Sequence, residues 1–269
     1  WPHWDYRRVK GLGHVKLNDI VVFNYPAGDT LVSAPQYQAY DYYQMCYGLG
    51  WQLYQQHPNL DSISPVQRRA VFDQVYATGR QAIKDNAAEY GDIMTRPTDR
   101  RENYVKRCVG LPGMTLQIKN RIVYLNGKAN KEPDNVQYTY YMKLKVALSD
   151  DMMKDLGISN EDLTSLNQNG YMPLTKRAYN VLSHRKDLVQ SIRLNTDATD
   201  NDIYPLNGNM HWTRDNYGPI WIPAKGKSIH LDINNIAIYE RPIKVYEGND
   251  LQVKDGKIYI NGKRTDKYT

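Results

Sequence analysis

The sequence predicts an α+β protein in which three separated segments build an antiparallel, β-rich core and two helical insertions interrupt it. Short runs of β-branched residues, bounded by Gly, Pro and Asn, occur near the start, the middle and the end of the chain. Long polar stretches with helical spacing lie between them. We therefore assign residues 1–30, 98–130 and 229–269 to the β core, residues 31–97 to a helical insertion, and residues 131–228 to a second, mixed helical and loop insertion.

The first core segment contains a strand and leads into the first insertion. Residues 17–25 are typical of a polar turn followed by a β-branched strand, which Pro26 and the residues after it close. From about residue 37 to residue 90, polar and aromatic residues recur at helical spacing. The Ser64-Pro65 pair is a typical helix start, and it predicts a helix over residues 66–89.

The second core segment predicts a strand over residues 103–109, followed by a turn at Leu-Pro-Gly 111–113. Residues 116–125 have the pattern of a β-hairpin that turns at Asn120. A second tight turn is predicted at Asn126-Gly127.

The second insertion is predicted to be mainly helical, and the β pattern returns after it. Ser159 or Asn160 is expected to cap a helix over residues 161–166, and a longer helical run is expected over residues 174–194. The Asn- and Asp-rich residues 195–209 are typical of a loop. The last core segment predicts strands over residues 229–233, 236–239 and 251–260.

One stretch of sequence occurs twice. Residues 116–128 match residues 251–263 almost position for position, and both copies end in Asn-Gly-Lys. Two copies are too few for a solenoid, which needs three or more. We interpret the match as a favourable hairpin used twice, in preference to a recent duplication.

Composition excludes several classes of protein. The chain carries 35 Lys and Arg against 29 Asp and Glu, so a net charge of +6 permits attraction to anionic lipid or nucleic acid without requiring it. No apolar run is long enough to cross a bilayer. Two cysteines and six scattered histidines support neither a disulfide framework nor a metal site, so no metal and no cofactor is predicted. The 23 Tyr against 2 Phe suit half-buried surfaces, often outside the cytoplasm.

Lys106 is the candidate catalytic residue, because it lies within a predicted strand of apolar neighbours. Its neighbours Tyr104, Val105, Cys108 and Val109 are expected to be buried. The arginine that follows Lys106 is expected on the opposite face of the strand. If Lys106 faces the core, burial lowers its pKa; a base near neutral pH requires a fall of roughly 3 units from about 10.4. The alternative is a strand lysine that extends its ammonium into solvent.

The motif order resembles that of the bacterial type I signal peptidases, also called leader peptidases. The resemblance rests on Asp-Ile-Val-Val-Phe 19–23, on Tyr-Val-Lys-Arg-Cys-Val-Gly-Leu-Pro-Gly 104–113, and on a hairpin ending in Asn126-Gly127. The large insertions resemble those of the enzymes from the Bacteroides group. The resemblance implies a signal-peptidase-like β core and a general base at Lys106. It also implies a pocket for small substrate side chains that Val22, Tyr104 and Val105 line.

The chain departs from the family pattern at both ends. In the family, the nucleophile lies in a Ser-x-x-Pro segment ahead of the first strand, but residues 1–18 contain no serine. The family's Gly-Asp-Asn-Arg block would be expected to begin where the chain stops, after Thr269. Asn18 and Met114 stand where the family has Gly and Asp. Because the chain also begins with Trp1, we expect a piece of a longer enzyme that is inactive on its own.

The resemblance implies a membrane-anchored serine endopeptidase that removes signal peptides by a Ser/Lys dyad. It implies the cytoplasmic membrane as location, through an N-terminal anchor that is missing here, with the catalytic part on the periplasmic face. The expected partners are the signal peptides of exported preproteins, without nucleic acid. The alternative hypothesis is a non-enzymatic extracytoplasmic module that binds glycan or peptide through its Tyr and Trp residues.

Overall fold

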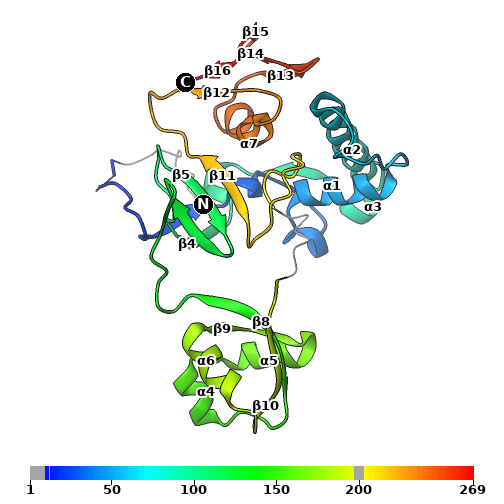
Figure 1. The fold of residues 1–269 in the computed structure, drawn as a ribbon. Helices are drawn as coiled ribbons and strands as arrows, with labels where there is room; N and C mark the ends of the chain where they lie inside the picture. The colour runs from blue at the N-terminus through cyan, green and yellow to red at the C-terminus, as the bar shows by residue number, and fades with distance from the viewer. Residues whose placement is uncertain (1–9, 12, 197–202) are drawn as a thin grey trace.

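The computed structural model describes residues 10, 11, 13–196 and 203–269, and it confirms a mixed α+β protein (Figure 1). The described strands form small antiparallel sheets: β1 with β4, β2 with β3, β12 with β16, and three sheets in the orders β10-β8-β9, β11-β5-β6-β7 and β13-β14-β15. None of the helices in these ranges is long and apolar enough to span a bilayer.

The strands are short. Their bounds are β1 (Ile20–Asn24), β2 (Thr30–Val32), β3 (Ile93–Thr95), β4 (Asn103–Arg107), β5 (Thr115–Lys119), β6 (Ile122–Leu125), β7 (Lys128–Ala129), β8 (Gln137–Leu144), β9 (Tyr171–Thr175), β10 (Val189–Leu194), β11 (Tyr217–Trp221), β12 (Ile229–His230), β13 (Leu251–Lys254), β14 (Lys257–Ile260), β15 (Lys263–Arg264) and β16 (Lys267–Tyr268).

The helices concentrate in the two predicted insertions. Their bounds are α1 (Tyr42–Leu53), α2 (Pro65–Asp85), α3 (Ala87–Tyr90), α4 (Asp150–Leu156), α5 (Asn160–Asn169), α6 (Lys176–His184) and α7 (Ile236–Arg241). Short tight or widened turns of helix add η1 (Pro26–Asp29), η2 (Pro35–Tyr37), η3 (Thr98–Arg100) and η4 (Pro242–Tyr246).

Helices α1 and α2 form a pair that follows β2, as the sequence predicts for the first insertion. Ser64 caps α2 through a reciprocal pair of hydrogen bonds with Gln67, which confirms the predicted helix start. Asp41 caps α1 by accepting hydrogen bonds from two backbone N–H groups at the start of the helix. The two helices cross closely because each carries a buried glycine at the contact, Gly50 in α1 and Gly79 in α2.

Gly79→Ala is expected to lower the free energy of unfolding by about 2–3 kcal/mol, because a Cβ at this position would lie 1.8 Å from the backbone O of Cys46. Gly48→Ala is the matched control in α1, because its Cβ would meet nothing within 4 Å. The higher helix propensity of alanine is expected to raise the free energy of unfolding of this variant by about 0.5–1 kcal/mol. Urea unfolding followed by tryptophan fluorescence, to which Trp51 of α1 contributes, measures both variants. Equal midpoints for the Gly79 variant and the wild-type chain would contradict the close crossing.

The repeated sequence folds as the same three-stranded meander in both copies. Leu116 pairs with Leu125 as Leu251 pairs with Ile260, and the remaining pairs of the two hairpins follow the same register. In each copy an asparagine at positive φ begins the second turn and accepts a hydrogen bond of 2.9 Å from the backbone N–H eleven residues earlier; these are Asn126 and Asn261. The predicted hairpins are therefore confirmed at both positions.

The two copies differ in what lies beside them. The strand β11, from the predicted second insertion, pairs antiparallel with β5 and extends the first meander to four strands. The second meander instead covers α7 and η4, and Leu251, Ile258 and Ile260 share one apolar cluster with the helical residues Ile236 and Ile243. The division of the chain into core and insertions remains a prediction.

Residues 137–194 form a unit with its own core, which we call the lobe; we call the other described residues the body (Figure 1). Helices α4, α5 and α6 pack on one face of the sheet β10-β8-β9 and bury Met172, Leu174 and Leu182 completely or almost so. The predicted cap of α5 is confirmed at Ser159, which accepts a hydrogen bond from the Asp162 N–H.

Three sequence predictions are wrong. The predicted strand over residues 236–239 is the helix α7, because Ile236, Tyr239 and Ile243 recur at helical spacing and bury one apolar stripe. The predicted helical run over residues 174–194 is instead the β9–α6–β10 unit, since its ends pair with β8. The mainly helical second insertion consequently contains a three-stranded sheet.

Candidate functional site

Lys106 lies on β4, the second strand of a two-stranded ribbon with β1. The register places Val21 opposite Lys106, Val22 opposite Val105, and Phe23 opposite Tyr104. The ribbon continues beyond the strands through the hydrogen bonds of Asn18 and Asp19 with the backbone of the residue after β4. This arrangement brings together the four residues that the sequence singles out.

The expected burial of the Lys106 strand is wrong. Lys106 is exposed, Val105 is 59% exposed, and Tyr104, Cys108 and Val109 are only half-buried. The physical reason is that β4 pairs with β1 alone, so the described residues cover the ribbon incompletely. Sequence alternation cannot show how many layers of structure cover a strand.

The four candidate residues divide between the two faces of the ribbon. Alternation along β4 puts Lys106 and Tyr104 on one face, and the Lys106 Nζ lies 5.9 Å from the centre of the Tyr104 ring. Val22 and Val105, which are 68% and 59% exposed, form a cross-strand pair on the other face. The predicted pocket residues therefore do not all surround the lysine.

Three further residues belong to the lysine face, and the sequence analysis missed them. Val21 lies directly across from Lys106, Phe23 packs at 6.4 Å from Tyr104, and Tyr25 stacks on the same ring at 4.5 Å. Alternation within residues 20–25 places Val21, Phe23 and Tyr25 on one face. The antiparallel register that puts them beside Lys106 is not legible in the sequence.

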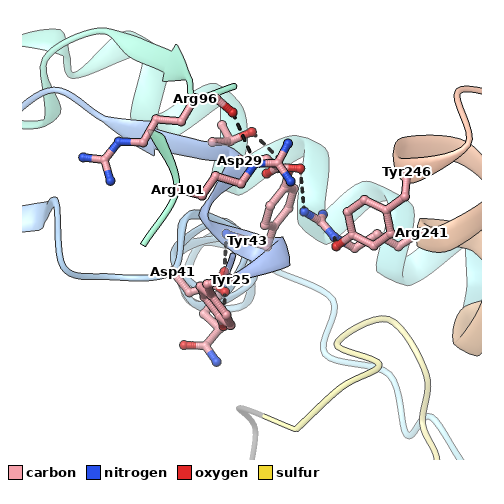
Figure 2. A network of polar contacts seen from close by, with 10 residues as sticks. Tyr25, Asp29, Asp41, Tyr43, Arg96, Arg101, Arg241 and Tyr246 are labelled. Carbon is pink, nitrogen blue, oxygen red and sulfur yellow. Dashed lines mark hydrogen bonds and ion pairs between the residues drawn. The ribbon is translucent and has the colours of Figure 1, made fainter. Parts of the chain in front are cut away.

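Tyr25 connects the ribbon to the helical pair. Its hydroxyl donates a hydrogen bond of 3.1 Å to Asp41, the residue that caps α1 (Figure 2). Burial, followed by the charge of Asp41, raises the pKa of Tyr25 to about 12, so this hydroxyl stays a donor at neutral pH. The stacked Tyr25 and Tyr104 rings beside Lys106 are thus connected to the start of α1 by this hydrogen bond.

A buried ion pair anchors the same end of the ribbon to α7. Asp29, the buried charged residue of the described chain, accepts a hydrogen bond of 2.8 Å from Tyr43 and one of 2.9 Å from Arg241 (Figure 2). The Arg241 guanidinium also lies 3.7 Å from the centre of the Tyr43 ring and donates to the Tyr246 hydroxyl. Asp29 lies five residues after the end of β1. The Asp29–Arg241 ion pair therefore holds the end of the ribbon near α7.

A second ion pair joins α7 to the helical pair of α1 and α2. Arg69 of α2 binds both carboxylate oxygens of Glu240 in α7, at 2.6 and 2.9 Å. Only 16% and 14% of these two side chains is exposed. Two neighbouring residues of α7 are therefore ion-paired to different elements, Glu240 to α2 and Arg241 to η1.

The backbone explains one departure from the family pattern. Asn18 has a φ of +71°, a conformation that glycine adopts freely and asparagine tolerates better than most residues. The turn that contains Met114 is also formed, because its N–H bonds the Leu111 carbonyl and Gly113 takes a φ of +86°. Both turns are thus formed with the residues that this chain carries.

The position expected for the nucleophile lies mostly outside the described residues, and it holds no serine in the sequence. Three serines elsewhere have structural partners: Ser64 caps α2, Ser33 accepts from the N–H of Asp92, and Ser228 bonds the terminal threonine. No group of His, Cys, Asp and Glu within the described ranges could hold a metal ion.

Comparison with known proteins defines the class as a peptidase. The model of the family described as signal peptidase, peptidase S26, matches residues 52–186, about half of the chain, and includes β4 with Lys106. The chain therefore belongs to the signal peptidase family.

Short segments also match individual relatives. Signal peptidase I of Bacillus caldolyticus is 48% identical over 42 residues, which are 16% of this chain and 23% of that protein. Signal peptidase I of Bacillus amyloliquefaciens is 59% identical over 32 residues, 12% of this chain and 17% of that protein. Signal peptidase IB of Staphylococcus aureus (strain Mu50) is 36% identical over 50 residues, 19% of this chain and 26% of that protein. The matching part thus spans about a quarter or less of these relatives. No solved structure matches the chain.

Proposed function

We propose that this chain is the lysine-bearing part of a membrane-anchored signal peptidase that removes signal peptides from exported preproteins by a Ser/Lys dyad. The observation that carries the proposal is the place of Lys106, on an exposed ribbon inside the range that the family model matches. The signal-peptidase-like core, the anchor in the cytoplasmic membrane and the periplasmic placement are parts of the same proposal.

The ribbon is suited to bind an extended peptide. Described strands cover neither outer edge of the β1–β4 pair, so its free backbone groups can pair with a further strand. A substrate bound in this way alternates its side chains between the two faces. Val22 and Val105 would line the apolar face, while Tyr104 would border the lysine face. In this proposal the small side chains that precede the cleaved bond would lie against these residues.

The amine of Lys106 would act as the general base. An uncharged amine accepts the proton of a serine hydroxyl, the alkoxide attacks the carbonyl carbon before the scissile bond, and backbone N–H groups hold the oxyanion. The protonated amine then returns the proton to the leaving nitrogen. The ammonium here is exposed to water, so a covering segment and the bound substrate must exclude that water before the amine can work. The serine would come from outside these 269 residues.

The test is cleavage of a preprotein by the full-length gene product, with residues 1–269 alone as the second sample. The full product is expected to release one signal peptide by cutting after a small residue, which mass spectrometry of the new amino end identifies. Residues 1–269 alone are expected to leave the substrate intact. An intact substrate in both samples, together with binding to glycan or peptide ligands, would instead favour the non-enzymatic module.

A further inference from the structure

The lobe carries a group of cations at the end of β8, on the chain that enters β10, and further along β10. Its members are Lys143 on β8, Lys145 just after it, Lys186 before β10, and Arg193 on β10; we call this group the basic tip. All four residues are exposed. The Lys145 ammonium donates a hydrogen bond of 2.7 Å to the Lys186 carbonyl, and the Lys145 N–H bonds the Leu188 carbonyl, so the two segments lie side by side.

The sheet geometry places the strand cations on the face that the helices leave open. Lys143 pairs with Ser191, and Arg193 pairs with Tyr141, so the two cations are diagonal neighbours across β8 and β10. The side chains that alternate with them, such as Met142 and Ile192, belong to the core beneath the helices. The open face therefore presents both positive charges in one direction.

The cations of the basic tip differ from the other arginines of the lobe. Arg177 binds Asp155 at 2.7 Å, and Arg185 binds Asp187 at 2.6 Å, so those charges are matched by carboxylates. Across the described residues, the four cations of the basic tip have no carboxylate within ion-pair distance. Arg193 is instead oriented by the Tyr141 ring, whose centre lies 4.1 Å from its guanidinium carbon.

Acidic residues nearby are engaged elsewhere. Hydrogen bonds from Arg185 lower the pKa of Asp187 to about 2, so this acid stays ionised and matched. Asp150 and Asp151 lie in the first turn of α4, where a carboxylate complements the helix N-terminus. Among the residues that the structure describes, the charge left over at the basic tip is positive.

The basic tip also exposes an apolar side chain. Val146 follows Lys145 directly and is 57% exposed. The open face adds Tyr141 and Tyr171, which contact each other edge to face at 5.9 Å. Surfaces that bind at the headgroup layer of a membrane combine cations with exposed aliphatic and tyrosine side chains. The basic tip and the open face of the sheet have this combination.

From this combination we infer that the basic tip of the lobe docks on an anionic phospholipid surface. The four cations would face lipid phosphates, each contributing on the order of 1 kcal/mol near an anionic membrane. Val146 would enter the boundary between headgroups and acyl chains. The lobe would then be a second membrane contact, separate from the ribbon that carries Lys106, and independent of whether the chain cleaves peptides.

Vesicle sedimentation of residues 1–269 tests this inference. Wild-type chain is expected to sediment with phosphatidylcholine vesicles that contain phosphatidylglycerol and to stay in solution with phosphatidylcholine alone. Lys143→Glu with Lys186→Glu is expected to weaken binding about tenfold or more. The matched control, Lys154→Glu with Lys176→Glu, makes the same change of net charge on the helices of the lobe and is expected to bind like the wild-type chain.

A second pair of variants tests the apolar part without a change of charge. Val146→Ser is expected to weaken vesicle binding about threefold or more. Val181→Ser, on the exposed part of α6, is the control, and it is expected to have no effect. Circular dichroism confirms that each variant is folded.

Three results would overturn the inference. The first is a wild-type chain that ignores vesicles with phosphatidylglycerol. The second is an equal loss in both charge-reversal pairs, which would assign binding to the net charge of +6 and not to the basic tip. The third is binding to polyglutamate but not to vesicles, which would assign the surface to an acidic polypeptide.

Discussion

Lys106→Ala in the full-length gene product is expected to reduce the kcat of signal-peptide cleavage about a thousandfold or more, with little change in KM. The amine would be the group that accepts the serine proton, and alanine leaves no base at that position. The measurement is kcat and KM on a preprotein with a defined cleavage site. Because Lys106 is exposed and its ammonium lies over the Tyr104 ring, its removal is expected to leave folding intact.

The first meander supplies a matched control. Lys119 is also an exposed strand lysine, with its ammonium 5.4 Å from the centre of the Tyr124 ring. Lys119→Ala is expected to cleave like the wild-type enzyme. Lys106→Arg keeps the positive charge but offers no usable base, because a guanidinium does not lose its proton in proteins. Activity in the arginine variant would therefore show that charge, and not proton transfer, is the role of this residue.

Asp29→Ala is expected to lower the free energy of unfolding of the body by about 3–5 kcal/mol. Only 9% of the Asp29 side chain and 18% of the Arg241 side chain is exposed, so the substitution leaves a buried guanidinium without its carboxylate. The change also removes the acceptor of the Tyr43 hydroxyl. Urea unfolding followed by tryptophan fluorescence does not report on the lobe, because the lobe contains no tryptophan.

Asp73→Ala is the control variant, because it removes the carboxylate of an exposed ion pair in place of a buried one. Asp73 is 54% exposed and pairs with Arg69 one helical turn away, so its removal is expected to cost less than about 0.5 kcal/mol. Replacing Asp29 and Arg241 together by apolar residues of similar size is expected to restore part of the loss. Equal, small losses for Asp29→Ala and Asp73→Ala would contradict the anchoring role of the buried pair.

The sequence predicted the elements that short-range chemistry specifies. The start of α2 follows from the adjacent Ser64 and Pro65, and the structure adds Gln67 to the same cap. The turns of both meanders follow from Asn126-Gly127 and Asn261-Gly262, where the asparagine and glycine take the positive φ that the turn requires. In each of these cases the interacting groups are a few residues apart, so no knowledge of the rest of the fold is needed.

The sequence failed where distant contacts decide the structure. Residues 236–239 contain β-branched and aromatic residues, but packing against the second meander favours the helix α7. The expected burial of the residues around Lys106 was also wrong, since an apolar run looks the same in a covered strand and in an uncovered ribbon. The alternative, a strand lysine that extends its ammonium into solvent, agrees with the exposure of Lys106.

For the candidate site, the motif around residues 104–113 was enough to single out Lys106 and to indicate the family, which the comparisons then confirmed. Its neighbours on the other strand were decided by tertiary structure: the register brings Val21 opposite the lysine and Val22 opposite Val105. Asp29 and Arg241 likewise meet although they lie 212 positions apart in the sequence. The sequence by itself determines which groups a strand or turn presents, because backbone preferences act over a few residues. Which groups share a face, and how much water reaches them, is determined only when distant segments pair and bury one another.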